Sequence, residues 1–508
     1  MIKEQSYIQS FSDKMLSKYG LNLQDKEIIS SLIKKAIDEK LYTDTKDYQH
    51  NLKHIEKVIA YVRMIVNKMN HPLINEEILM YAALYHDIGK TMGASNQEHG
   101  IVGAAEFKKM MQGKLDDKSI EIISRLIYQH ASESDLINFE NANYTDEEKK
   151  SIQLTSDILK DADALDRNRL NYPAPIGTCD INKLRTNEAK EILGITDSLY
   201  NDYCSTIISQ REKETGKKIL DNYELLEQWI QDFNNGEINM FHASLDPSVD
   251  ILRPTESTQK GAYVYAGISP VNCVTMAAFR SSTIFPRTKI NGKRAIMEIF
   301  PGSLEKTLGS KYITIYKLPN DKFHEYIAEA TAAPTREWVS SESVEPIEQI
   351  SFKALDLLNY LKSTNQLAII QQHSKEKQFE SYMQSFQMYI WGVKSLKEKP
   401  DIMNQKWKMV EAIIIYYSKN EETLNIMNAI RKDLDTNINS YIEKFKKQYG
   451  REPNYDNENE CLVPILHLFE EKYYKKDENG KKVLNFDYIN SLYEKNNAKV
   501  LEEQSKKR

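Results

Sequence analysis

The chain has 508 residues, of which 41% are hydrophobic and 28% charged, and its formal net charge is −6. This composition excludes wholesale disorder, and the absence of a long basic block argues against non-specific nucleic-acid binding. The N-terminal stretch lacks a secretory signal, and no apolar run reaches the length of a membrane span. Four widely spaced cysteines indicate a reducing compartment. We therefore expect a cytoplasmic protein without membrane contact, although export without an N-terminal signal, as for a secreted effector, stays open.

Changes in hydrophobic periodicity divide the chain into three predicted domains. Apolar residues at three- and four-residue spacing, as at Ile55 and Val58, predict an all-α helical bundle over residues 1–235. Short apolar runs separated by Pro, Gly, Asn and Ser predict strands in a small α+β domain over residues 237–352. The helical period returns over residues 353–508, which predicts an all-α region that packs, oligomerises or binds a partner. The sequence leaves the oligomeric state open.

Histidines and aspartates gather in the first predicted domain. Six of the ten histidines lie between residues 50 and 130, and the aspartate-rich segment ILKDADALDRNRL follows. A single histidine on an apolar helix face is often a packed core residue, but several helices that each deliver His or Asp favour a metal site. Imidazole nitrogens and carboxylate oxygens together suit divalent transition metals better than Ca²⁺. The candidates are His50, His54, His86, Asp87, His99, His130, Asp161, Asp163 and Asp166. For Asp161 or Asp166, a role as helix cap or salt-bridge partner is the alternative.

The segment HDIGK closes the apolar run ILMYAALYHDIGK. Adjacent helical residues diverge by roughly 100°, so Asp87 can share one ion with His86 or bridge two ions with its two oxygens. Lys90 lies three residues later and is placed to offer a positive charge to a phosphoryl group. Gly89 lets the backbone approach closely there. Metal sites of this kind generate hydroxide near neutral pH and hold phosphate oxygens, so the segment predicts phosphate chemistry.

The ligand order H…HD…D, at residues 54, 86–87 and 163, resembles that of the HD-domain metal-dependent phosphohydrolases. In that family a valine follows the first histidine by four residues, which selects His54 over His50. The final aspartate lies in an ADxL context, which selects Asp163 over Asp161. The resemblance covers about residues 45 to 200. It implies a helical metallohydrolase domain.

Two further histidines are similar in order to those of HD-GYP-type phosphodiesterases. The segments HDIGK, EHGIVGAAEF and YQH carry this similarity. It implies that His99 and His130 bind a second metal ion and that Asp87 bridges the two ions. The GYP element is absent, so cyclic-di-GMP is not the default substrate.

The resemblance implies a phosphodiesterase or nucleotidase that acts on a small-molecule nucleotide or phosphodiester through a metal-activated hydroxide. Its cofactors would be two divalent ions, with Mn, Fe, Ni, Co, Zn and Mg all open. The expected catalytic residues are Asp87, Lys90 and His50. Lys90 and Arg167 are the expected substrate contacts, although for Arg167 the sequence favours a structural ion pair over a phosphate contact. Dinuclear-iron oxygenases share the ligand order, and Lys90 favours phosphate over that chemistry.

The second predicted domain resembles the ADP-ribosyltransferase fold in the order of four residues. His242 lies in FHASLDP, Tyr263 and Tyr265 lie in AYVYAG, and Glu337 lies in TREWVS. In that fold a histidine grips the ribose of NAD, a tyrosine stacks on nicotinamide and a glutamate polarises the acceptor. The alternative function is therefore an NAD-using toxin- or effector-like protein that modifies a protein target, with the metal domain auxiliary. A buried His and Tyr without a catalytic role would explain the same pattern.

Overall fold

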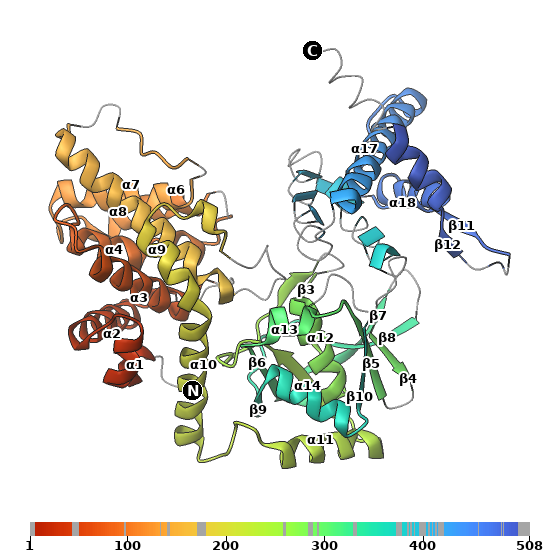
Figure 1. The fold of residues 1–508 in the computed structure, drawn as a ribbon, viewed down its shortest axis with the longest axis horizontal. Helices are drawn as coiled ribbons and strands as arrows, with labels where there is room; N and C mark the ends of the chain where they lie inside the picture. Colours follow the sequence, from red (N-terminus) through yellow and green to blue (C-terminus); the bar gives the residue numbers. More distant parts are fainter. Residues whose placement is uncertain are drawn as a thin grey trace.

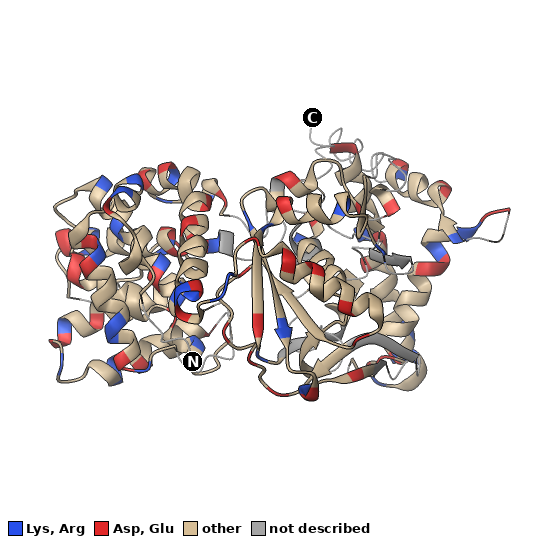
Figure 2. Cartoon of the chain, turned by 90° about the horizontal axis from the view of Figure 1, so that it is seen from below, with Lys and Arg blue, Asp and Glu red and all other residues tan. Residues whose placement is uncertain are grey.

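The computed structural model describes residues 6–42, 50–95, 98–132, 134–139, 143–169, 179–257, 261–282, 288–291, 294–328, 333–371 and most of 378–495. Figure 1 shows a helical region, then a region with strands, then further helices, which confirms the predicted multidomain fold class. No helix among these residues is both long enough and apolar enough to cross a membrane. In the view of Figure 2, acidic and basic residues are scattered over all parts of the chain.

The first region is a bundle of helices packed around α3. Its helices are α1 (Asp13–Lys18), α2 (Leu23–Asp38), α3 (Leu52–Met69), α4 (Glu76–Tyr85), α5 (Ile88–Thr91), α6 (His99–Met111), α7 (Asp117–His130), α8 (Asp146–Leu165), α9 (Asn187–Ile192) and α10 (Thr196–Thr215). Helix α11 (Tyr223–Asn235) follows and packs in the core of the region with strands. Short 3₁₀ turns are η1 (Ile8–Ser10), η2 (Asp166–Arg169), η3 (Ile181–Lys183) and η4 (Leu193–Ile195).

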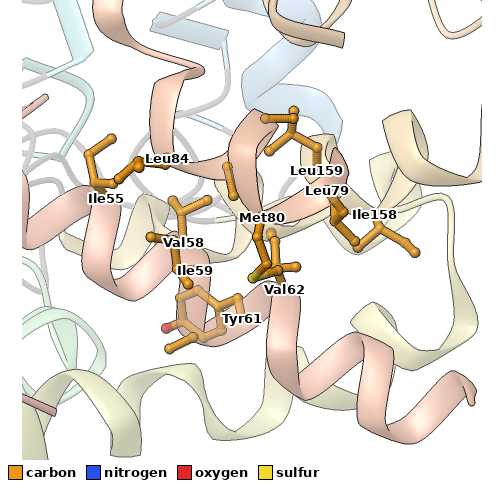
Figure 3. Packing of buried hydrophobic residues seen from close by; sticks show 14 of the residues in the cluster. Ile55, Val58, Ile59, Tyr61, Val62, Leu79, Met80, Leu84, Ile158 and Leu159 are labelled. Carbon is orange, nitrogen blue, oxygen red and sulfur yellow. The ribbon is translucent and has the colours of Figure 1, made fainter. Parts of the chain in front are cut away.

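Helix α3 is the central element of this bundle. Every residue from His54 to Val66 is buried, as expected for a helix that has neighbours on all sides. Figure 3 shows its apolar side chains packing with those of α4 and α8. Its N-terminus is fixed by Asn51, whose side chain accepts hydrogen bonds from the backbone N–H groups of Lys53 and His54. The cap therefore sets the position of the first turn.

The described residues of the second region form three small sheets. Its strands are β1 (Met240–Ser244), β2 (Thr255–Ser257), β3 (Gly261–Ala266), β4 (Thr288–Asn291), β5 (Arg294–Ile299), β6 (Tyr312–Leu318), β7 (His324–Ala328), β8 (Ala333–Ser340), β9 (Glu348–Lys353) and β10 (Leu367–Gln371). The helices are α12 (Pro270–Ser282), α13 (Ser303–Leu308) and α14 (Ala354–Ser363), and η5 (Asn320–Lys322) is a 3₁₀ turn. The strand orders are β1-β6-β9, β10-β5-β4 and β2-β3-β8-β7.

Strand β6 is the central strand of the first of these sheets. It is antiparallel to β1 and β9, so that Ile315 pairs with Ala243 on one side and Ile350 on the other. All but one of its residues are buried, which matches its nearly continuous apolar sequence, YITIYKL. The sheet therefore forms part of the core of this region.

One strand lies beyond the expected end of the α+β domain. Strand β10 follows residue 352 and runs parallel to β5, with Ile369 opposite Met297. The uniform helical period expected from residue 353 was therefore wrong for β10, whose five residues are too few to show a period. The domain boundaries at residues 235 and 352 stay predictions, and we propose that the second domain extends to Gln371.

The last region has its own buried cluster, which contains Phe300 and side chains from residues 382 to 489. Its described elements are η6 (Gly392–Ser395), α17 (Glu421–Tyr449), α18 (Leu462–Tyr473), β11 (Tyr474–Lys476) and β12 (Lys482–Leu484). The antiparallel hairpin β11–β12 corrects the expectation that this region contains helices alone.

Candidate metal centre

Six side chains that the sequence singles out as metal ligands come from the ends of the helices in the first region. His54 lies in the first turn of α3, and His86 and Asp87 lie between α4 and α5. His99 begins α6, and His130 ends α7. Asp163 lies in the last turn of α8. Helix ends that meet at one point bring residues far apart in sequence into a single cluster.

One half of the cluster surrounds Oδ2 of Asp87. This oxygen lies 3.2 Å from Nε2 of His54 and 3.3 Å from Nε2 of His86. The two Nε2 atoms are 3.3 Å apart. Oδ1 of Asp163 lies 3.3 Å from Nε2 of His54. One ion at the centre of this group would meet two nitrogens and two carboxylate oxygens.

The other half surrounds Oδ1 of the same carboxylate. This oxygen lies 3.4 Å from Nε2 of His99 and 3.4 Å from Nε2 of His130. The two imidazole nitrogens are 3.0 Å apart. Asp87 therefore belongs to both groups that could hold an ion, one through each oxygen.

The imidazole rings are oriented so that Nε2 is the free ligand atom. Nδ1 of His86 lies 2.9 Å from the carbonyl of Ala83, and Nδ1 of His130 contacts the carbonyl of Ile127. A carbonyl only accepts hydrogen bonds, so each Nδ1 must carry the proton. In the neutral ring Nε2 then has a lone pair, which is the form that binds metal. Converging lone pairs at these separations repel one another unless a cation or a proton lies between them, so the donor set fits divalent metal ions.

The two aspartates are held in their charged form. Burial alone would raise the pKa of Asp87, but the surrounding imidazoles, His86 and His50 foremost, lower it well below its ordinary value. The pKa of Asp163 is lowered in the same way, against the effect of burial, by its hydrogen bond with His54. Both carboxylates are therefore ionised near neutral pH, as metal ligands must be.

Three glycines let α5, α6 and α7 approach closely enough to bring His99 and His130 to Asp87. A Cβ added at Gly89 would lie 2.1 Å from the carbonyl oxygen of His99. One added at Gly100 would lie 2.8 Å from the carbonyl oxygen of Tyr128. Gly103 faces the backbone of Gly89 in the same way. The close neighbour of Gly89 is therefore the helix that carries His99.

Two aspartates of the DADALDR segment have different surroundings from Asp163. Asp161 accepts hydrogen bonds from the backbone N–H groups of Arg185 and Thr186, at 3.0 and 2.8 Å, and so fixes the start of α9. Asp166 is fully buried, and its Oδ2 lies 2.8 Å from Nδ1 of His54. Its Oδ1 lies 2.9 Å from Nζ of Lys57. A role as helix cap or salt-bridge partner was expected for one of these two aspartates, but the support that Asp166 gives to His54 was not predicted.

The expected substrate contacts lie around this cluster. Nε2 of His50 is 3.9 Å from Oδ2 of Asp87. Lys90 is buried in α5, where its backbone N–H donates to the carbonyl of Asp87. Arg167 is exposed in η2, after the last turn of α8. Their roles toward a substrate stay predictions.

The predicted NAD site in the second region is described only in part. Nδ1 of His242 lies 2.9 Å from the carbonyl of Tyr265, across β1 and β3. The rings of Tyr263 and Tyr265 are 6.3 Å apart. Glu337 belongs to β8, but its side chain lies outside the described residues. An NAD-binding role for these residues stays a prediction.

Comparison with known proteins locates one family in the chain. Residues 51–168 match the family model described as HD domain. An uncharacterized protein of Clostridium beijerinckii (strain ATCC 51743 / NCIMB 8052) is 29% identical over 117 residues, which cover 23% of this chain and 72% of that protein. No solved structure matches the chain significantly. The matched segment contains all six side chains of the cluster.

Proposed function

We propose that this chain, which contains an HD domain at residues 51–168, is a metal-dependent phosphohydrolase that cleaves a phosphoester bond in a nucleotide or other phosphodiester. The observation that carries the proposal is the position of Asp87. Its two oxygens face two separate groups of imidazole Nε2 atoms at 3.2 to 3.4 Å. One carboxylate between two such groups is suited to bridge two divalent ions.

The side chains of the cluster would bind the metal ions, and their exposure indicates the side from which a substrate enters. His54, His86, Asp87 and Asp163 would hold one ion, and Asp87 would share a second with His99 and His130. Divalent ions bound there would lower the pKa of water and neutralise charge on a phosphoryl group. The side chain of Asp163 is 38% exposed, whereas those of His54 and His86 are fully buried. Substrate would therefore approach from the side of Asp163.

Three further residues are proposed to contact the substrate. Lys90 would donate to a phosphate oxygen, because its charge lies one turn after Asp87. Arg167 is exposed and follows Asp163 by four residues, so it would meet a phosphate at the entrance. His50 lies on the same side of α3 as His54 and would contact the leaving group. These three roles rest on position and charge.

Metal analysis together with hydrolysis of bis-p-nitrophenyl phosphate in Mn²⁺ tests the proposal. The wild-type protein is expected to bind two ions per chain and to release p-nitrophenol. The substitutions Asp87→Ala and His86→Ala should each lower the rate at least about 100-fold, because they remove charge stabilisation at the reacting phosphate. His71→Ala is the matched control, since His71 is an exposed histidine of the same domain. Activity that survives both site substitutions would contradict the metal mechanism.

The substrate itself requires a separate screen of purified protein. Cyclic nucleotides, deoxynucleoside triphosphates, guanosine polyphosphates and ADP-ribosylated species cover the phosphate classes that the site could admit. An active substrate should lose turnover in Asp87→Ala and keep it in His71→Ala. A substrate that is still turned over by Asp87→Ala would be attributed to a contaminant or to another region.

A further inference from the structure

The loop that follows β1 packs against the first turn of α3. Nζ of Lys53 donates to the carbonyl of Ser248 and lies 3.6 Å from a carboxylate oxygen of Asp250. Arg211, from α10, donates to the carbonyl of Pro247 at 2.8 Å and also pairs with Asp250. Two cationic side chains of the helical region thus bind the same loop of the region with strands.

This loop is held firmly from its own side. Its Ser248 is 2% exposed and donates from its backbone N–H to the side chain of Asp246 at 2.8 Å. The hydroxyl of Tyr316, on the central strand β6, donates to the carbonyl of Asp246 at 2.7 Å. Arg211 is also 2% exposed. Arg211 is therefore a buried contact with fixed partners on both sides, whereas Lys53 and Asp250, with side chains 21% and 41% exposed, lie at the edge of the same contact.

A second contact between the two regions runs through one tyrosine. Nζ of Lys311, which lies just before β6, is 4.5 Å from the ring centroid of Tyr200 on α10. Nζ of Lys57, on α3, is 5.0 Å from the same ring. The aromatic ring therefore lies within reach of one cation from each region.

Both contacts converge on His54. Lys53 is its neighbour in the first turn of α3. Lys57 is one turn later and binds Asp166, whose other oxygen lies 2.8 Å from Nδ1 of His54. His99 and His130 belong to α6 and α7, whose spacing is set by the glycine contacts described above. Side-chain contacts thus connect the region with strands to the His54 side of the cluster.

We infer that the region with strands positions His54 and thereby sets the affinity of one of the two metal sites. Lys53 and Asp250 are positioning residues that act through the first turn of α3. The inference rests on the proposed function, because it assumes that both halves of the cluster bind metal. It extends that function by making the second region a structural part of the HD-domain site.

Titration of the full-length metal-free protein with Co²⁺ tests this inference. A competing chromophoric chelator gives the two dissociation constants, and the visible Co²⁺ bands report ligand geometry. In Lys53→Met and in Asp250→Asn one constant should rise about tenfold, with a change in the bands, while the other stays the same. Lys53→Arg keeps donors at the same position and should restore wild-type binding.

Two control substitutions remove comparable charges elsewhere. Lys68→Met lies on α3 and removes an ion pair with Glu191. Glu342→Gln removes an exposed ion pair with Lys322 in the region with strands. Both should bind Co²⁺ like the wild type. Asp250→Asn, whose side chain is 41% exposed, provides the test if Lys53→Met fails to fold.

The outcomes separate the inference from the proposed function. A wild-type protein that binds no Co²⁺ overturns the proposed function and the inference with it. If the wild type binds two ions while Lys53→Met and Asp250→Asn behave like the controls, the inference alone is overturned. Equal weakening of both constants also overturns it, because the contacts would then act on the whole fold.

Discussion

Asp166 is buried and binds two side chains of α3 at once. Its Oδ2 lies 2.8 Å from Nδ1 of His54, and its Oδ1 lies 2.9 Å from Nζ of Lys57. A carboxylate in this position accepts a hydrogen bond from Nδ1–H of the imidazole. The proton therefore stays on Nδ1, and Nε2 is left free to bind metal. The lysine supplies the positive charge that a buried carboxylate requires. The tautomer of His54 thus depends on a residue that contacts no ion.

We predict that Asp166→Asn weakens metal binding about 10- to 100-fold, the usual loss when a partner of a ligating histidine is changed. The amide can donate to Nδ1, which favours the tautomer with the proton on Nε2, and it also leaves Lys57 without a counter-charge. Competition with a chelator measures the dissociation constant. Asp146→Asn is the control, because Asp146 lies in the first turn of α8 with a side chain that is 95% exposed. Equal constants for the two variants would contradict the role of Asp166.

At the scale of elements, the site depends on how closely three helices approach. The His99 and His130 side of the cluster exists because α6 lies directly against both α5 and α7. Gly89, Gly100 and Gly103 remove the Cβ atoms that would keep these helices apart. The separation of the helices, and with it the distance from Asp87 to the two histidines, follows from those small residues.

We predict that Gly89→Ala disrupts the His99 side of the cluster and destabilises the fold by about 1–3 kcal/mol. The new Cβ would lie 2.1 Å from the carbonyl oxygen of His99, so α5 and α6 must move apart. Urea unfolding measures the stability, and metal analysis should find one ion per chain in place of two. Gly194→Ala is the control, because nothing lies within 4 Å of a Cβ at that position. Two bound ions in Gly89→Ala would show that the helices tolerate the added atom.

Hydrophobic periodicity and motif order predict only part of the site. The order of His54, His86, Asp87 and Asp163 resembles the ligand order of a known family, and the helices that carry these residues follow the 3.6-residue period. Asp166 was missed because its partner, His54, is more than one hundred residues away, and sequence spacing does not record such contacts. Strand β10 was missed because its identity depends on pairing with β5, a contact made only in the folded chain.

At the scale of the whole molecule, the helical region and the region with strands share buried charged contacts. Arg211 is 2% exposed and donates a hydrogen bond to the loop after β1, and Lys53 of α3 donates to the same loop. A buried cation that loses its partners costs several kcal/mol, so separation of the two regions is unfavourable. We therefore expect these two regions to unfold together.

Binding of metal at the HD domain should then stabilise a part of the chain that holds no ligand. All four tryptophans lie at residue 229 or later, so their fluorescence reports on the regions outside the cluster. Mn²⁺ at about 100 times its dissociation constant stabilises the native state by about 2.7 kcal/mol for each occupied site. With a urea dependence of about 2–3 kcal/mol per M, the tryptophan transition should move to higher urea by about 1 M for each occupied site.

Unfolding of the wild type and of Asp87→Ala, each with and without Mn²⁺, provides the measurement. The variant should show no shift, because Asp87 belongs to both halves of the cluster. Far-ultraviolet circular dichroism, which follows the helices, should move together with the fluorescence in the wild type. Trp229 is buried in α11, within the core of the second region, so its signal requires that core to unfold. A shift seen by dichroism alone would mean that the helical region unfolds independently and that the contacts through Lys53 and Arg211 do not couple the two regions.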